Sequence, residues 1–248
     1  MKIIEAKNYH DMSQKAAQFM IEKVNLLASP VLGLATGGTP LGTYKYLRED
    51  HLNHHTSYSH VYTVNLDEYV GIPPDNENSY FSYMKKQLFD HIDIPRSHTH
   101  LPDGMAKDLS VECYRYEDLI KRLGGIDLQL LGIGMNGHIG FNEPGTPFSS
   151  KTHLVELTSS TRKANARYFD SLATVPSQAI TMGISTIMES KQILLLVSGP
   201  KKAEVMAKLL NEEPNKDTPA SVLKRHQDVI IIADSDALAL VKERSRNY

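Results

Sequence analysis

Apolar residues follow two patterns that alternate along the chain. Between residues 12 and 27 they recur every three or four positions, as at Ala16, Met20 and Val24, which predicts an amphipathic helix. Similar spacing with capping signals predicts helices at 79–91, 108–123, 201–210 and 235–243, and Pro40 marks the start of another. Short continuous apolar runs predict strands at 31–35, 61–66, 126–133, 193–197 and 229–233.

The predicted strands are runs of β-branched residues and leucine that do not alternate with polar positions. Such runs are typical of strands covered on both faces, as in a parallel sheet with crossover helices. The fold class predicted is therefore α/β, doubly wound, with a mostly parallel sheet. Because no composition break or long linker divides the chain, we expect one domain over residues 1–248. Residues 146–181 have the least regular pattern, and we interpret them as a lid over a site.

Composition and charge narrow the function classes. The formal net charge is −2 and there is no long basic run, which argues against nucleic acid or a membrane surface as the main partner. No apolar run approaches the ~20 residues that cross a bilayer, and the amino terminus lacks the apolar core of a signal peptide. The single cysteine, Cys113, fits a reducing compartment, so we expect a cytoplasmic protein.

In an open parallel sheet, ligands bind beyond the carboxyl ends of the strands, so the loops there are the first candidates. The loop after the strand at 31–35 reads Thr36, Gly37, Gly38, Thr39 before Pro40. Glycines let backbone N–H groups approach an anion, and a following helix adds its positive end. The loop has neither a Walker A ending nor a GxGxxG pattern. A plain turn is the alternative, but the paired glycines and threonines favour phosphate binding.

Two acids follow the strand at 61–66. Asp67 or Glu68 could act as a general base, and burial would raise the pKa of a carboxyl there and make it more basic. A helix N-cap or a solvated acid pair is the commoner meaning of such a pair. On its own, this pattern is weak evidence for catalysis.

The loop after the strand at 126–133 is rich in glycine, with five in residues 132–145. It also carries Asn136, His138 and Glu143. A histidine can shuttle protons near neutrality, and a carboxylate can orient it through the other ring nitrogen. The alternative is a single hydrogen-bonded histidine in a glycine-rich turn. The pairing of His138 with Glu143 in a loop beyond a sheet strand favours catalysis.

Several cations and histidines carry weaker signals. Cations that could complete a phosphate site are Arg162, Lys163, Arg167, Lys201 and Lys202, although each is more often a surface charge. Four histidines cluster at His51, His54, His55 and His60. No cysteine accompanies them, and we interpret the segment as a polar connection, with no metal site.

Five collinear segments together resemble the glucosamine-6-phosphate deaminase family: LGLATGGTPLGTY, NLDEYVGI, NSYFSYM, LLGIGMNGHIGFNEPG and STRKANARYF. They span nearly the whole chain. The related 6-phosphogluconolactonases share the fold and a GxDGH segment, but the FNEPG continuation and the NLDEY loop are not expected of them. The resemblance implies a Rossmann-like three-layer α/β sandwich with a short lid. It also implies conversion of glucosamine 6-phosphate and water to fructose 6-phosphate and ammonia, without a cofactor or metal.

The resemblance also assigns roles to residues. It implies that Asp67 moves the proton between C2 and C1 of the open-chain sugar, and that His138 opens the pyranose ring. Asn136 and Glu143 are implied as its orienting partners. The residues implied for the phosphate site are Thr36, Gly37, Gly38, Thr39, Arg167 and Lys202.

Two departures from the family pattern bear on regulation and pH. Many members carry aspartate in place of Asn136; asparagine brings no full charge, so we expect a shifted pH profile and an unchanged reaction. Allosteric members carry basic residues ten to twelve positions after the motif glutamate, where this chain has His153 and Val155. The carboxyl end is short as well, so we predict a non-allosteric enzyme and favour a monomer.

Other functions on the same fold remain as alternatives. A 6-phosphogluconolactonase or a sugar-phosphate isomerase is the nearest, and ammonia release separates it from a deaminase. A silent sugar-phosphate-binding module would not need Asp67, His138 and Glu143 together, and the chain has no room for an added DNA-binding segment. A serine hydrolase is disfavoured because the chain has no GxSxG elbow.

Overall fold

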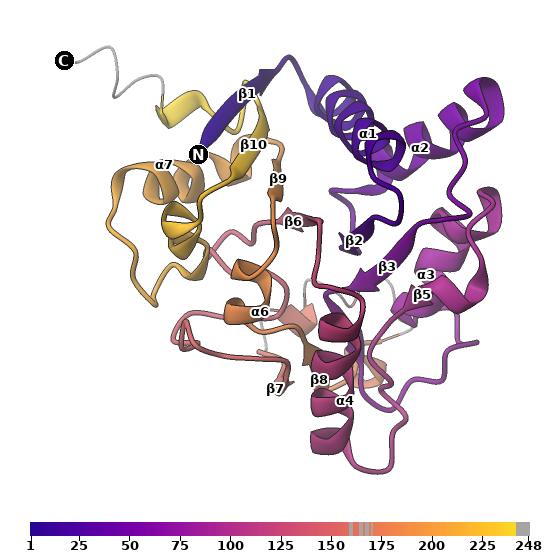
Figure 1. Cartoon of the computed structure of the whole chain (residues 1–248). Helices are drawn as coiled ribbons and strands as arrows, with labels where there is room; N and C mark the ends of the chain where they lie inside the picture. The colour runs from indigo at the N-terminus through magenta and orange to yellow at the C-terminus, as the bar shows by residue number, and fades with distance from the viewer. Residues whose placement is uncertain (159–160, 164–165, 167–168, 170, 242–248) are drawn as a thin grey trace.

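A computed structural model of the chain describes residues 1–158, 161–163, 166, 169 and 171–241. Its centre is a seven-stranded sheet in the order β1-β10-β9-β6-β2-β3-β5, with every pairing parallel (Figure 1). The strands are β1 (Lys2–Ala6), β2 (Val31–Leu34), β3 (Tyr62–Asn65), β5 (Thr99–His100), β6 (Leu128–Gly132), β9 (Ile193–Val197) and β10 (Val229–Asp234). The predicted mostly parallel sheet is confirmed.

Helices cover both faces of this sheet (Figure 1). One face carries α1 (Tyr9–Leu26), α2 (Leu41–His54) and α3 (Tyr80–Gln87), and the other carries α4 (Leu109–Arg122), α6 (Ile184–Met188) and α7 (Ala203–Asn211). Successive strand residues point to opposite faces, so in β10 Ile231 packs into one core while Ile230 and Ile232 pack into the other. This explains why the strands lack polar alternation, and it confirms the three-layer, doubly wound architecture.

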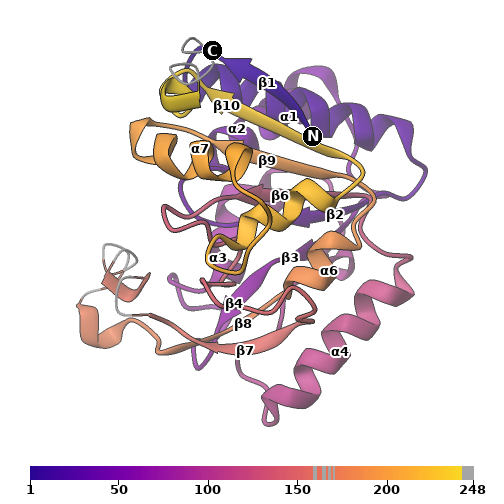
Figure 2. The same cartoon turned by 90° about the vertical axis from the view of Figure 1, so that its left-hand side faces the viewer.

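A second, antiparallel sheet lies below the central one in Figure 2. It pairs β4 (Asp67–Tyr69), β8 (Gln178–Thr181) and β7 (His153–Glu156) in the order β4-β8-β7. The sequence pattern did not predict it, because each strand is too short for periodicity to reveal. Two of its strands fall within the predicted lid at 146–181, which is therefore more regular than expected. The movement of that segment stays a prediction.

Several element ends differ from the predictions. α1 starts before residue 12, because the side chain of Asn8 accepts the Asp11 N–H at 3.0 Å and caps the helix there. The helix predicted at 79–91 breaks at Leu88, whose φ is −142°, and continues as a 3₁₀ turn. Strand β1 was not predicted. The helix predicted at 235–243 begins with turns at 235–238, and its last residues lie outside the described part of the chain.

Short 3₁₀ helices link the larger elements: η1 (Phe89–His91), η2 (Arg96–His98), η4 (Leu172–Thr174), η5 (Pro200–Lys202) and η6 (Pro219–Arg225). The described residues include no helix that combines the length and the apolarity needed for a membrane span.

The strand order reverses between β2 and β6. From β2 the chain moves outward through β3 to β5, and it then returns to the other side of β2 with β6. At such a switch point the loops leaving the two strands diverge and open a crevice at their carboxyl ends. The two glycine-rich loops singled out in the sequence leave these two strands.

Candidate active site

The first loop connects β2 to α2 and exposes its backbone. Gly37 has a φ of 88°, which allows the sharp turn, whereas Gly38 lies outside the left-handed region. A Cβ placed on either glycine would meet no atom within 4 Å. Pro40, the N-cap residue of α2, makes no side-chain capping hydrogen bond, and the positive end of the helix lies at the end of the loop. An open backbone in front of a helix start is a suitable place for an anion.

Lys202 adds a positive charge beside this loop. It lies in η5, beyond the end of β9, and its Nζ donates to the carbonyl of Ile133 at 2.7 Å. The preceding residue, Gly132, lies close to Thr39, because a Cβ there would be 3.9 Å from the Thr39 side chain. Burial lowers the pKa of Lys202. The structure thus brings Lys202 to the two loops, whereas Lys201 is exposed.

The other predicted cations are placed differently. The guanidinium of Arg162 donates to the carbonyls of Leu172 and Val175, at 3.1 and 2.9 Å, so it holds the segment around η4 together. No contact ties Lys163 to the site within the described part of the chain. Arg167, which the resemblance assigns to the phosphate site, lies outside the described residues.

Asp67 is a buried carboxyl at the start of β4, with 6% of its surface exposed. Burial, and next the charge of Glu68, raise its pKa to about 8. A Cβ on Gly140 would lie 3.7 Å from Asp67 Oδ2, so the second glycine-rich loop passes directly by this carboxyl. The structure therefore brings Asp67 and that loop together, although they come from different strands.

Glu68 has a separate, structural task. Its carboxylate accepts the N–H groups of Tyr69, Tyr80 and Phe81 at 2.8–2.9 Å. Two of these belong to the first turn of α3, so Glu68 joins β4 to the start of that helix. Burial raises its pKa to about 7 despite these hydrogen bonds. Of the two adjacent acids, only Asp67 lies beside the loops.

Backbone and amide contacts hold the second loop against β8, the neighbour of β4. The N–H of Phe141 donates to Thr181 Oγ1 at 3.1 Å. The buried amide of Asn142 donates to the carbonyls of Ile139 and Met182, each at 2.9 Å. Sequence reasoning assigned no role to Asn142, since an asparagine that binds backbone groups has no distinctive spacing. These contacts fix the path of the loop past Asp67.

His138, Asn136 and Glu143 form a hydrogen-bonded chain. His138 Nδ1 lies 2.8 Å from Asn136 Oδ1 and 3.6 Å from Glu143 Oε2. Asn136 Nδ2 donates to Glu143 Oε2 at 2.6 Å. On the far side, Thr161 Oγ1 donates to Glu143 Oε1 at 2.7 Å, which joins these three residues to the segment at 146–181. The structure thus brings together all three predicted residues and adds Thr161, which sequence reasoning missed.

The negative charge of Glu143 determines how the side chains of Asn136 and His138 are oriented. Burial raises its pKa, but the imidazole of His138 and hydrogen bonds from Thr161 and Asn136 outweigh burial and bring it to about 2. The ionised carboxylate only accepts hydrogen bonds, so the amide nitrogen of Asn136 faces it and the amide oxygen faces His138. That oxygen is also only an acceptor, so Nδ1 of His138 carries a proton. In the neutral imidazole, Nε2 then has the free lone pair.

The glycine at position 134 is required by the imidazole. A Cβ there would lie 2.3 Å from the ring of His138, so the ring packs flat against a bare backbone. The N–H of Gly134 also donates to the carbonyl of His138 at 2.9 Å. This contact explains one glycine of the sequence motif by packing.

Tyr80 is a further polar group of the site to which sequence reasoning gave no role. It is hydrogen-bonded to Thr36 of the first loop, and its hydroxyl donates to that of Tyr69 at 3.1 Å. Burial raises its pKa, and the neighbouring charge of Asp67 raises it further. Tyr80 thus joins Thr36 of the first loop to Tyr69 of β4, and its only sequence signal was a tyrosine in the NSYFSYM segment.

The four clustered histidines have local structural contacts. His51 Nδ1 bonds the carbonyl of Thr56, and His60 Nε2 bonds that of Val24. His54 pairs with Asp50, and His55 ends α2 with a φ of 60°. The described part of the chain contains no group of three His, Cys, Asp or Glu side chains placed to hold a metal ion.

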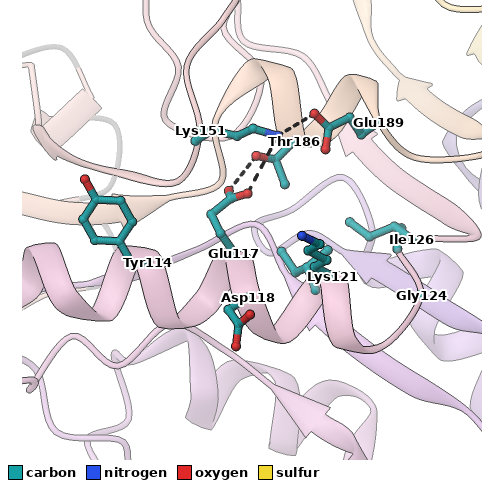
Figure 3. A pocket seen from close by; sticks show the side chains of 11 residues that line it. Tyr114, Glu117, Asp118, Lys121, Gly124, Ile126, Lys151, Thr186 and Glu189 are labelled. Atoms are coloured by element: carbon teal, nitrogen blue, oxygen red, sulfur yellow. Dashed lines mark hydrogen bonds and ion pairs between the residues drawn. The ribbon is translucent and has the colours of Figure 1, made fainter.

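A cavity of about 740 Å³ lies away from these loops, between α4, α6 and Lys151 (Figure 3). Glu117 at its wall accepts hydrogen bonds from Thr152 and Thr186, and Lys151 pairs with Glu189. Dashed lines in Figure 3 join Glu117, Lys151, Thr186 and Glu189 to one another, whereas Tyr114, Asp118 and Lys121 have none. Of the predicted site residues that the structure describes, none lines this cavity.

Comparison with known proteins places the chain in a family. The family model of glucosamine-6-phosphate isomerases and 6-phosphogluconolactonases matches residues 7–232. A glucosamine-6-phosphate deaminase of Geobacillus sp. (strain WCH70) is 62% identical over 99% of this chain and 98% of its own. Glucosamine-6-phosphate deaminase 1 of Bacillus subtilis (strain 168) is 51% identical over 97% of this chain and 99% of its own.

Solved structures agree as well. A structure described as a monomeric glucosamine-6-phosphate deaminase superposes with a TM-score of 0.95 and 51% identity, covering 97% of this chain and 100% of that one. The 6-phosphogluconolactonase of Trypanosoma brucei has a TM-score of 0.77 at 19% identity, over 96% of this chain and 97% of its own, which shows a shared fold. The chain belongs to the family of glucosamine-6-phosphate isomerases and 6-phosphogluconolactonases.

Proposed function

We propose that this protein is a glucosamine-6-phosphate deaminase, which converts glucosamine 6-phosphate and water to fructose 6-phosphate and ammonia. The observation that carries the proposal is a buried carboxyl, Asp67, beside a loop in which His138 is oriented by Asn136 and Glu143. An isomerisation coupled to deamination needs both a base for carbon and a proton shuttle for ring opening. The names of relatives that are 51–62% identical over nearly the whole chain support the same reaction.

The phosphate of the substrate binds at the first loop in this proposal. Thr36, Gly37, Gly38 and Thr39 supply backbone N–H groups, and Lys202 supplies a positive charge. Arg167 stays a predicted second cation, on the strength of the family resemblance. Anchoring the phosphate there holds the other end of the sugar near Asp67, and fixed geometry of this kind lowers the barrier to proton transfer.

His138 acts first, by opening the pyranose ring. Because the Nδ1–H of His138 donates a hydrogen bond to Asn136, the lone pair at Nε2 is free to take the proton of the anomeric hydroxyl. The same nitrogen then returns a proton to the ring oxygen as the ring bond breaks. The charge of Glu143, 3.6 Å from Nδ1, stabilises the imidazolium formed between these two steps.

Asp67 acts on the open-chain sugar. Its carboxylate removes the proton from C2, the electron pair left behind forms the C1=C2 double bond, and the aldehyde oxygen takes a proton from water, which gives an enolamine with a C1 hydroxyl. Asp67 returns its proton to C1 and leaves an iminium at C2. Water adds there, and ammonia departs as the C2 carbonyl forms and a proton is released. A pKa of about 8 makes Asp67 a much stronger base than an ordinary carboxylate, which suits removal of a proton from carbon.

The direct test measures ammonia released from glucosamine 6-phosphate, with hydrolysis of 6-phosphogluconolactone measured in parallel. Ammonia release by the wild type and its loss in Asp67→Asn support the proposal. Lactone hydrolysis without ammonia release would identify the alternative function, which the family model also includes and whose solved example shares the fold at 19% identity. For the role of His138, His138→Gln should lose more activity on the cyclic substrate than on an open-chain analogue. Equal losses on both would contradict the ring-opening role.

Assembly, regulation and location follow as parts of the proposal. We expect a monomer, as described for a relative that is 51% identical, and light scattering during size exclusion tests this. We also expect hyperbolic kinetics that N-acetylglucosamine 6-phosphate does not alter, because the expected effector positions hold His153 and Val155. A cytoplasmic location fits a substrate that is a charged sugar phosphate.

A further inference from the structure

Three tyrosines bind the carbonyl oxygens of the β2–α2 loop. The hydroxyl of Tyr44 donates to the carbonyl of Ala35 at 2.5 Å. Tyr83, from α3, donates to Gly37 at 2.6 Å, and Tyr9, from the first turn of α1, donates to Gly38 at 3.0 Å. These side chains come from three helices, α1, α2 and α3, and all reach the same short loop. None of the three was singled out by sequence reasoning.

The direction of a carbonyl determines the direction of the next N–H group. The peptide bonds of the described chain include no cis bond, and in a planar trans peptide C=O and N–H point in opposite directions. When Tyr83 holds the Gly37 carbonyl on one side, the Gly38 N–H points to the other. In the same way, Tyr9 holds the Gly38 carbonyl, so the N–H of Thr39 points away from Tyr9.

The glycine pair makes such a restraint necessary. A peptide between two glycines can rotate with little steric cost, because neither residue has a Cβ. Rotation would replace an N–H donor with a carbonyl oxygen, whose partial negative charge would repel a phosphate. A Cβ on either glycine would meet nothing within 4 Å, so no group packs against that side of either residue. Tyrosine hydroxyls donate hydrogen bonds to both glycine carbonyls.

We propose that the hydroxyls of Tyr9 and Tyr83 are positioning groups for the substrate phosphate. Each holds one carbonyl of the glycine pair away from the site, so that the following N–H faces the anion. This inference rests on the proposed phosphate site and adds to it the groups that preorganise its backbone donors. Preorganised donors bind an anion more tightly because binding then costs less ordering of the loop.

Tyr9 has a second contact that fits this task. Its oxygen accepts the N–H of Gly42 in the first turn of α2, at 2.8 Å, while its hydrogen goes to Gly38. One hydroxyl therefore connects the loop to the helix start that faces the anion. This contact leaves the N–H groups of the loop itself for the ligand. Tyr9 is 38% exposed, so the hydroxyl is not needed to satisfy a buried core.

The test removes single hydroxyls, in Tyr9→Phe, Tyr83→Phe and the double variant. Tyr46→Phe is the matched control, because its hydroxyl bonds His10 between α1 and α2 and does not touch the loop. Each protein is assayed for KM and kcat with glucosamine 6-phosphate, for competitive inhibition by inorganic phosphate, and for its melting temperature. Binding of inorganic phosphate is also measured directly by calorimetry.

We expect KM and the inhibition constant of phosphate to rise together, by about threefold to tenfold for each hydroxyl removed, which is the range of one hydrogen bond. We expect kcat and melting temperature to match those of the Tyr46→Phe control. Unchanged phosphate inhibition in the double variant would overturn the inference, as would a loss confined to kcat. If the wild type released no ammonia, the proposed reaction would fail, but phosphate calorimetry on the same variants would still decide the role of the tyrosines.

Discussion

Asp67 and Glu68 are adjacent in β4, yet their carboxyls serve opposite sides of the strand. Asp67 lies by the second glycine-rich loop, whereas Glu68 accepts three backbone N–H groups at the start of α3. Both are buried, and the charge of Glu68 adds to the burial that raises the pKa of Asp67 to about 8. Glu68 thus joins β4 to the start of α3 and also raises the pKa of Asp67 beside it.

Asp67→Asn should abolish activity and stabilise the fold at alkaline pH. The folded-state pKa of Asp67 is raised from 3.8 to about 8, so the folded protein binds a proton that the unfolded chain has released. The protonated Asp67 therefore contributes its full share to the free energy of unfolding below pH 4, and this contribution is lost as the pH rises to 8. We expect the variant to gain about 1–3 kcal/mol over wild type at pH 8.5.

Denaturant unfolding at pH 8.5 and pH 5 checks the sign of this prediction. The stability gap between Asp67→Asn and wild type should be clearly larger at pH 8.5. A gap that is the same at both values would mean that the pKa of Asp67 is not raised in the folded protein. Turnover at wild-type rate by this variant would remove Asp67 as the base.

Glu68→Gln should move the acid limb of the pH–rate profile toward lower pH. The limb of kcat/KM reports the base in the free enzyme, and we expect it near pH 8 for the wild type. Removing the charge of Glu68 removes one of the two causes that raise the pKa of Asp67. Glutamine retains one oxygen for the N–H groups of Tyr80 and Phe81, so some loss of stability is expected too. A limb that stays in place would show that burial alone sets the pKa.

Long elements were predictable from the sequence because a buried face imposes a period on many residues. β9 matches its predicted range, and α4 is framed as expected by Asp108 and by Gly124 and Gly125 with positive φ. The small antiparallel sheet was not predictable, since β4 has three residues and pairs with β8 more than a hundred positions later. Pairing at that distance depends on the assembled fold and not on a local pattern.

In the site, too, contacts between residues close in sequence were predictable and contacts between distant residues were not. His138, Asn136 and Glu143 lie within one loop, so their contact follows from the sequence motif. Thr161, Tyr9 and Tyr83 reach the loops from distant elements, and each is a common residue with no spacing to mark it. Their roles became visible only when the tertiary contacts were known.

Asn136→Asp should retain activity, whereas Asn136→Leu should lose about tenfold to a hundredfold in turnover, the range of a hydrogen bond to a charged group. Aspartate can still accept from His138 Nδ1, although it faces the ionised Glu143, so we expect an altered pH profile. Leucine can neither accept from His138 nor donate to Glu143, and the ring loses its fixed tautomer. Full pH–rate profiles of both variants, with circular dichroism as a folding control, check this. Wild-type turnover by Asn136→Leu would contradict the orienting role.

Gly38→Ala should separate binding from folding. The residue has no positive φ, and a Cβ there would meet no protein atom within 4 Å, so alanine fits the empty protein. We expect stability unchanged or raised by about 0.4–1 kcal/mol, because alanine reduces the freedom of the unfolded chain. The added methyl would stand in the space that the proposed phosphate occupies, so KM and the inhibition constant of inorganic phosphate should rise sharply.

Gly134→Ala is the matched contrast, since its Cβ would lie 2.3 Å from the His138 ring. That methyl would push the imidazole out of place, so we expect kcat to fall while phosphate inhibition stays near wild type. Melting curves, kinetics and phosphate titrations on the pair separate the two effects. Normal phosphate binding by a folded Gly38→Ala variant would mean that the anion does not approach this backbone, and the phosphate site would have to lie elsewhere.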